Sequence, residues 1–496
     1  IKDDNSVAFQ IRSYGWSIGA SYSVVTNMDE LAIYDCTAMP RHTDNADFAR
    51  VVYMKTENYM DNFDRLNSFL GREETISNSH RVRFVGKDSI DKNFSKALSS
   101  VRLNLAQAII NGNHYKISIA DINLWTQIIL NRILFIRVCE ARGLERDGLL
   151  KDFAATDFWT EFKRSSYIDF YEHYDGPMFA RIRHIQDLII DNAVFDDLLS
   201  YLYYPSPYCF DVIPLKSISD IYDLFLGYHL EYDDSGILEN VLKSEFRKSN
   251  GAVTTPEHIV HNTIDSTVPS EYLQSLTNQQ ILDLKFLDPA CGSGVFLVSI
   301  YDHLATQIES NIEERKDVLP HRYLYEKDGK KYLNLEGRKL IVNQCLHGVD
   351  INHECVEVAK LSLSLKIIDG FEPIDFNNAG LYGSQILHGV GVNIKCGNSL
   401  VEPDILERFS CISENLEELA ATNVFDYKTA FCDIFSRGGF DYVIGNPPYV
   451  EVKNYNVALP CMSAYIKQRY GSSRNGKIDL AIPFIERGIE LLNEHG

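Results

Sequence analysis

The sequence of 496 residues lacks the marks of a membrane or secreted protein. It contains no stretch of about 18 apolar residues free of charge, which argues against a membrane-spanning helix. Its first residues, Ile-Lys-Asp-Asp-Asn, show neither the basic nor the apolar segment of a signal peptide. Ten cysteines are scattered singly, with no Cys-x-x-Cys pair, so neither a disulfide framework nor a zinc site is expected. We therefore expect a cytoplasmic protein without a membrane partner.

Basic charge is also scarce. The chain has 48 lysines and arginines against 69 acidic residues, a net charge of −21. Nucleic-acid-binding proteins usually carry a basic surface, but a net charge does not exclude a local basic groove. The balance of charge therefore leaves DNA binding open. The length and the 45% of hydrophobic residues predict about two to four domains.

Three segments of different pattern follow one another. Residues 1–43 predict a helix and two strands, at Tyr22–Thr26 and Leu31–Asp35. Residues 44–248 have a helical pattern, clearest at Leu124–Cys139, where two apolar stripes predict a helix buried on both sides. From 249 to 496 helices alternate with β-rich runs, which predicts a parallel sheet with helices on both faces. The expected strands are Lys285–Leu287, Leu346–Val349, Asn393–Lys395 and Tyr442–Ile444, with an inserted loop or hairpin at Glu326–Arg338.

The first motif of the third segment is a glycine-rich turn, Phe286–Gly294 (F-L-D-P-A-C-G-S-G), between a strand and a helix. Glycines at such a turn let a ligand approach the backbone, and the helix N-terminus offers unpaired N–H groups. A dinucleotide site would need a third glycine where this chain has Leu297. A nicotinamide or flavin site is therefore not expected.

The next two motifs are polar residues at strand ends. Asp350 ends a short strand, where its carboxylate can bind both hydroxyls of a ribose while Ile351 lies against an adenine face; the alternative is a helix N-cap. Asn398, followed by Ser399, ends another strand and can bind an adenine amino group, or simply stabilise the turn.

The fourth motif, Asn446-Pro447-Pro448-Tyr449, follows a buried strand. The prolines fix the backbone and remove two N–H donors, which leaves carbonyls facing the cleft. The amino group of adenine is a poor nucleophile because its lone pair is delocalised into the ring. Two acceptors, the Asn446 side-chain oxygen and the Pro447 carbonyl, can take both amino protons and favour a nucleophilic geometry. Tyr449 supplies a face on which a base can stack.

In this order, and each at a strand end, the four motifs resemble those of the amino-methylating DNA methyltransferases over roughly residues 250–496. The resemblance implies S-adenosyl-L-methionine as cofactor and double-stranded DNA as substrate. Residues 251–256 resemble the first cofactor motif of the family, although Val253 and Thr254 replace its usual aromatics. Asn398 stands where many members have Asp.

The resemblance also assigns roles to single residues. The glycine-rich turn would hold the methionine part of the cofactor, Asp350 the ribose, and Ile351 and Asn398 the adenine. The implied cofactor-binding residues are Thr255, Pro256, Asp288, Pro289, Ala290, Gly292, Gly294, Asp350, Ile351, Asn398 and Ser399. The implied catalytic residues, which receive the flipped target adenine, are Asn446, Pro447, Pro448 and Tyr449.

The upstream segments resemble the type IIG restriction-modification enzymes, which fuse a nuclease, a helical connector and a methyltransferase. Gln10 and Tyr14 resemble the helix that follows the catalytic acids in one branch of PD-(D/E)xK nucleases; the acids and lysine themselves would precede Ile1. We therefore expect the end of a nuclease domain (1–43), a connector (44–248) and a Rossmann-like methyltransferase domain (249–496) that lacks its last strands. Mg²⁺ would serve only the nuclease of the full-length protein, the methyltransferase needs no metal, and the sequence does not predict the oligomeric state.

The expected function is site-specific methylation of adenine N6. Two alternatives stay open: a methyltransferase of a phage-defence system that does not cut DNA, and an enzyme that methylates a glutamine amide of a protein.

Overall fold

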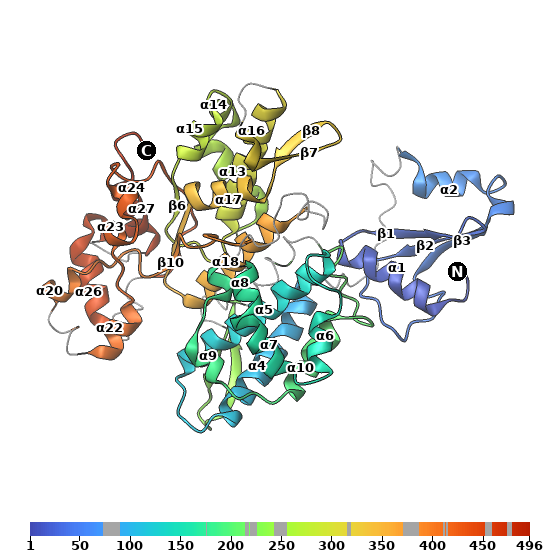
Figure 1. The fold of residues 1–496 in the computed structure, drawn as a ribbon, viewed down its shortest axis with the longest axis horizontal. Helices are drawn as coiled ribbons and strands as arrows, with labels where there is room; N and C mark the ends of the chain where they lie inside the picture. The colour runs from blue at the N-terminus through green and yellow to red at the C-terminus, as the bar shows by residue number, and fades with distance from the viewer. Residues whose placement is uncertain are drawn as a thin grey trace.

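The computed structural model describes residues 1–72, 90–174, 176–213, 218, 226–242, 255–314, 319–370, 386–409, 412, 415–451, 459–473 and 479–496. Three units follow one another along the chain (Figure 1). They are a small N-terminal sheet, a helical connector, and a parallel sheet flanked by helices. This agrees with the mixed α/β architecture expected from the sequence.

The N-terminal unit packs α1 (Asn5–Ser17) on the antiparallel sheet β1 (Tyr22–Thr26), β2 (Glu30–Asp35) and β3 (Arg50–Lys55). The carboxylate of Asp4 caps α1 by accepting hydrogen bonds from the backbone N–H groups of Ser6 and Val7. The helix and the first two strands were predicted. The third strand was not, and it carries the sheet beyond the expected boundary at residue 43. Five of its six residues pair with β2, a contact between separate segments that the local helical pattern does not reveal.

The connector is built around α4 (Ile90–Gly112) and α5 (Ile119–Ala141). As predicted, α5 is buried on both sides, and Gly143 adopts a left-handed φ of 71° just beyond its end. Among the described residues only α5 is long and apolar enough to cross a membrane, but 78% of its apolar window is buried in the protein. The expected helical pattern is wrong at its end, where β4 (Tyr228–Tyr232) and β5 (Leu238–Leu242) form an antiparallel hairpin.

The third unit contains four parallel strands, β6 (Phe286–Asp288), β9 (Leu346–Asp350), β10 (Ile394–Cys396) and β11 (Tyr442–Val443). All four overlap the predicted strands. Their spatial order is β10-β9-β6-β11, so the chain moves outward from β6 and then returns to its other side. Ligands of open α/β sheets bind where the strand order reverses, at the carboxyl ends of the strands. Here that point lies between β6 and β11.

The strands of this unit are connected by α16 (Val295–Glu313), α17 (Leu335–Cys345) and α18 (His353–Ile368). The expected insertion is a hairpin of β7 (Leu324–Lys327) and β8 (Lys330–Leu333). A parallel bridge between Phe440 and Leu492 places the residues after the last helix beside β11. The remaining described elements are η1 (Thr56–Asn58), α2 (Phe63–Leu70), α6 (Leu149–Ala154), α7 (Phe158–Tyr167), α8 (Asp169–Tyr174), η2 (Pro177–Phe179), α9 (Arg183–Asp187), α10 (Ala193–Leu202), α13 (Glu257–Thr267), α14 (Ser270–Gln274), α15 (Asn278–Asp283), η3 (His321–Tyr323), α20 (Ile405–Arg408), α22 (Leu416–Thr422), α23 (Tyr427–Ala430), α24 (Cys432–Phe435), α26 (Pro460–Arg469), η5 (Gly471–Ser473) and α27 (Ala481–Leu491).

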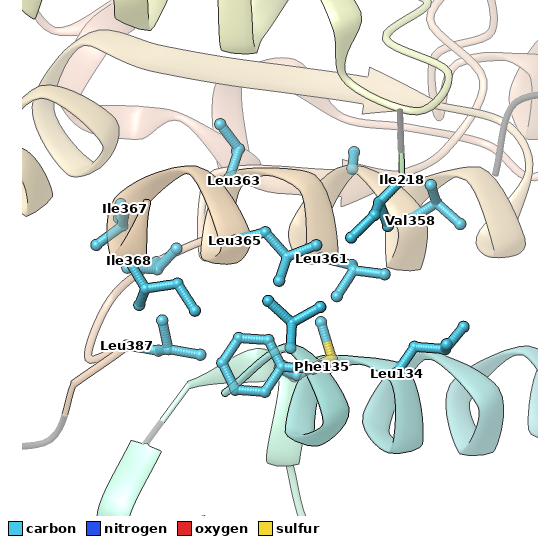
Figure 2. Packing of buried hydrophobic residues seen from close by; sticks show 14 of the residues in the cluster. Leu134, Phe135, Ile218, Val358, Leu361, Leu363, Leu365, Ile367, Ile368 and Leu387 are labelled. Carbon is cyan, nitrogen blue, oxygen red and sulfur yellow. The ribbon is translucent and has the colours of Figure 1, made fainter. Parts of the chain in front are cut away.

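The connector and the parallel-sheet unit share one hydrophobic core. Leu361 and Leu365 of α18 lie against Leu134 and Phe135 of α5, and all four side chains are at most 2% exposed (Figure 2). One buried apolar cluster contains side chains of both units. Because the two helices bury each other's apolar faces, α18 is held in place by the connector.

Eight of the described cysteines carry free thiols. Cys461 is disulfide-bonded. The scattered cysteines led us to expect no disulfide framework, because sequence spacing alone does not show which thiols the fold brings into contact.

Candidate active site

The glycine-rich turn between β6 and α16 holds a buried carboxylate. Asp288 is 1% exposed, and its Oδ1 accepts a hydrogen bond from the Ala290 N–H at 3.0 Å. Gly292 and Gly294 have φ of 52° and 89°, in the left-handed region that favours glycine. A Cβ on Gly294 would lie 3.3 Å from Cα and Cβ of Ala359, so this turn packs closely on α18.

Burial raises the pKa of Asp288 from 3.8 to about 7, partly opposed by the Ala290 N–H and reinforced by the nearby Asp350 carboxylate. Gly445, at the end of β11, lies directly against this carboxylate. A Cβ at that position would stand 2.3 Å from Oδ1 of Asp288. Sequence reasoning missed Gly445, although its place just before Asn446 at a strand end was the available signal. The first and fourth motifs therefore meet at the reversal point of the sheet.

Asp350 uses both carboxylate oxygens to organise the neighbouring turns. Its Oδ2 accepts from the Gly292 N–H and its Oδ1 from the Asn352 N–H, each at 2.9 Å. The N-cap of α18 is Asn352, whose Oδ1 accepts from the Glu354 N–H at 2.8 Å, so Asp350 is not the helix cap.

Ile351 lies beside Asp350 with 48% of its surface exposed. It borders a cavity of about 770 Å³ between the parallel-sheet unit and the connector. The other walls are residues 119–121, 123–124, 229–231 and 352–354. The role expected for Ile351, a face for the adenine ring, stays a prediction.

Asn398 and Ser399 brace the turn after β10. The Asn398 Nδ2 donates to the Thr422 carbonyl at 3.1 Å, and its Oδ1 accepts from the Leu400 N–H at 3.0 Å. The Ser399 hydroxyl donates to the Pro289 carbonyl at 2.5 Å and accepts from Tyr427 at 2.8 Å, which ties the third turn to the first. Both side chains are buried. The expected contact of Asn398 with adenine stays a prediction, because its amide is bonded here to protein atoms.

The Asn-Pro-Pro-Tyr segment follows β11 at the same edge of the sheet. Asn446, Pro447 and Pro448 are half-buried, whereas Tyr449 is 74% exposed. The Asn446 Nδ2 donates to the Thr255 hydroxyl at 3.0 Å, across 191 residues of sequence. Thr255 thus directs the amide so that its oxygen faces away from the hydroxyl. Pro256 precedes α13 as its N-cap, and residues 251–254 of this motif lie outside the described residues.

Two further expectations concern the N-terminal helix and metal binding. Gln10 and Tyr14 share one face of α1, and the Gln10 Nε2 donates to the Tyr14 hydroxyl at 3.4 Å. Within the part of the chain that the structure describes, no group of three His, Cys, Asp or Glu side chains is arranged to hold a metal ion.

Comparison with known proteins adds to this geometry. Residues 344–496 match the family described as Eco57I restriction-modification methylase. The chain is 28% identical over 503 residues to the type II restriction enzyme and methyltransferase RM.Eco57I of Escherichia coli, covering 99% of this chain and 47% of that protein. It is 25% identical over 262 residues to the adenine-specific methyltransferase PglX of Streptomyces coelicolor, covering 52% of this chain and 19% of that protein.

Among solved structures, the chain is similar to the Type IIL restriction-modification enzyme MmeI in complex with DNA, with a TM-score of 0.47 and 15% identity over 80% of this chain and 48% of that one. The chain spans less than half the length of the two relatives named above. The resemblance to restriction-modification enzymes drawn from the motifs is confirmed. Residues 344–496 are similar to the Eco57I restriction-modification methylases.

Proposed function

We propose that this chain is the methyltransferase part of a type IIG restriction-modification enzyme, which methylates N6 of adenine in double-stranded DNA. The observation that carries the proposal is the placement of Asn446. Its amide is fixed by Thr255 at the reversal point of the parallel sheet, and the preceding Gly445 lies against the buried Asp288. An oriented amide oxygen at a ligand-binding edge is what activation of an amino group requires.

The residues at the sheet edge fit S-adenosyl-L-methionine. Gly292 and Gly294 form the tight turn before α16, Asp350 would present its carboxylate to ribose hydroxyls, and Ile351 would offer an apolar face to the adenine ring. The Asp288 carboxylate lies where a cationic methionine group would favour its ionised form. When bound, the cofactor supplies an electrophilic methyl group on a sulfonium.

The target base must leave the helix to reach Asn446. We infer that the adenine is rotated out of the duplex and stacks on the exposed ring of Tyr449. The Asn446 side-chain oxygen and the Pro447 carbonyl would then accept hydrogen bonds from the two amino hydrogens. These bonds would localise the lone pair on the nitrogen. With the cofactor bound, this nitrogen would displace the sulfonium from the methyl carbon while Asn446 and Pro447 hold the amino group, and the extra proton on nitrogen would then pass to water.

The upstream units complete the proposal. We infer that the sheet β1-β2-β3 with α1 belongs to a PD-(D/E)xK-type nuclease domain. The helices from α4 onward would be the connector between nuclease and methyltransferase. Cleavage of DNA by the full-length protein, its Mg²⁺ requirement and its location in the cytoplasm belong to this proposal.

Transfer of a labelled methyl group tests the assignment. The full-length protein should label duplex DNA, with label in N6-methyladenine, and should not label protein glutamine. Label in a protein substrate alone would contradict the proposal. Methylation of DNA without Mg²⁺-dependent cleavage would instead support the alternative of a phage-defence methyltransferase that does not cut.

A further inference from the structure

Arg102 of α4 joins the connector to the parallel-sheet unit through a buried ion pair. Its side chain is 0% exposed, and its Nη2 lies 2.8 Å from Oε2 of Glu354 in the first turn of α18. The same guanidinium donates to Oδ1 of Asn123 at 2.9 Å and to the carbonyl of Tyr228 at 3.1 Å. Two connector helices and the β4 strand therefore fix this one cation.

The ion pair continues as a chain of hydrogen bonds into the candidate cofactor site. The Glu354 N–H donates to Oδ1 of Asn352 at 2.8 Å, and the Asn352 N–H donates to Oδ1 of Asp350 at 2.9 Å. The other oxygen of Asp350 accepts from Gly292 in the glycine-rich turn. Two residues, Glu354 and Asn352, thus separate a connector arginine from the carboxylate assigned to the ribose.

A buried ion pair is a costly way to join two apolar surfaces. Desolvation of the charges offsets most of their attraction, and apolar residues of similar size often stabilise a fold as well. The surrounding interface is apolar, with Leu134 and Phe135 packed on α18 (Figure 2). Apolar contacts are not directional, whereas the ion pair between Arg102 and Glu354 fixes the direction of the backbone in the first turn of α18.

We propose that Arg102 is a positioning residue for the cofactor site, through which the connector holds the Asp350 carboxylate in the geometry that binds ribose. This inference rests on the proposed function, since it assigns Asp350 to the cofactor. The Arg102 side chain touches neither cofactor nor substrate; it acts through Glu354 and Asn352. The connector is then part of the methyltransferase site as well as a spacer.

The test measures the affinity of the full-length protein for S-adenosyl-L-methionine by calorimetry, beside the thermal midpoint of each variant. Arg102→Gln should weaken binding roughly 3- to 30-fold, the range for residues that couple two sites at a distance. Arg137→Gln is the matched control, because Arg137 lies 3.5 Å from Glu140 within the connector and bonds to Leu202. It should lower the thermal midpoint without changing cofactor affinity.

Two more variants keep the inference testable if Arg102→Gln unfolds. Glu354→Gln retains an oxygen for Arg102 and should bind the cofactor nearly as well as the unmodified protein, whereas Glu354→Ala should bind more weakly. In an Asp350→Ala background, loss of Arg102 should cause no further loss of affinity, because both act through one carboxylate. If the losses of affinity in the double variant were additive, the inference would be overturned. The same would follow if Arg102→Gln and Glu354→Ala bound the cofactor as well as the unmodified protein. Neither result would contradict the proposed function. Failure of the unmodified protein to bind the cofactor would overturn the proposed function and the inference with it.

Discussion

The side chains of Thr255 and Asn446 are 3.0 Å apart although 191 residues separate them in the sequence. The Thr255 hydroxyl accepts a hydrogen bond from the amide nitrogen of Asn446. This bond determines which way the amide oxygen points. In the proposed mechanism this oxygen accepts a hydrogen of the target amino group. Thr255 therefore links the segment before α13 to the reacting atom.

Removal of the hydroxyl should slow methyl transfer. Thr255→Val keeps the shape of the side chain but loses the acceptor for Asn446, and turnover should fall roughly 10- to 100-fold, as when the partners that orient a reacting ligand are removed. Thr255→Ser keeps the hydroxyl and serves as the control. Single-turnover methylation of a duplex should separate the two variants. Equal rates in both would contradict an orienting role.

The raised pKa of Asp288 predicts a pH dependence of cofactor binding. Its carboxyl is protonated below about pH 7 and ionised above it. A cationic cofactor prefers the ionised form, so affinity should rise as the pH increases through 7. Calorimetry from pH 6 to 8 should show this rise in the unmodified protein and a smaller one in Asp288→Asn. The same pH dependence of affinity in both proteins would show that Asp288 does not act on the cofactor.

The same shift predicts a change in stability with the opposite sign. A carboxyl whose folded pKa lies above its unfolded value of 3.8 stabilises the fold at low pH, and this contribution is lost as the pH rises through about 7. Asp288→Asn should therefore stabilise the free protein at pH 8 relative to the unmodified chain, but not at pH 4. Urea unfolding at both values provides the measurement, and a stabilisation of equal size at pH 4 would refute the shift.

Asp350→Ala should weaken cofactor binding while the fold survives. Two charge-assisted hydrogen bonds to ribose hydroxyls are at stake, roughly 1.5–3 kcal/mol each. Asn334→Ala is a suitable control, because Asn334 caps α17 by accepting from the Gly337 N–H and lies outside the site. If both variants were less stable but bound the cofactor with unchanged affinity, the role of Asp350 would be structural only.

The close approach of Gly445 to Asp288 predicts that no side chain is tolerated there. In Gly445→Ala the new Cβ would stand 2.3 Å from the carboxylate oxygen, so strand or turn must move. We expect a cost of about 1–3 kcal/mol in stability together with loss of cofactor binding. Gly488→Ala in α27 is the control, since its Cβ would meet Val443 at an ordinary 3.4 Å. Equal behaviour of the two variants would contradict the importance of this contact.

The sequence predicted the local elements of this fold better than their contacts. Strands ending in Asp288, Asp350 and the Asn-Pro-Pro-Tyr segment stand out because a short apolar run meets glycine, acid or proline within a few residues. The strand β3 was not predicted, because its pairing with β2 depends on tertiary contacts.

Contacts between distant segments were not predictable for the same reason. Thr255 meets Asn446 across 191 residues and Arg102 meets Glu354 across 252, and no local pattern marks either pair. Asn398 shows a different limit. A short amide in a turn can bind a ligand or the backbone, and only the placement of Thr422 and Leu400 shows that the backbone holds it here.

In the proposed mechanism Asn446 activates an adenine amino group, and methyl transfer to duplex DNA by Asn446→Ala tests this role. Loss of one preorganised polar contact at a reacting centre typically costs on the order of 100- to 1000-fold in rate. We predict a loss of this size with cofactor affinity unchanged, while Tyr449→Phe keeps most of its activity because the stacking face remains. Near-normal methylation of DNA by Asn446→Ala would contradict the assignment of this chain as an adenine methyltransferase.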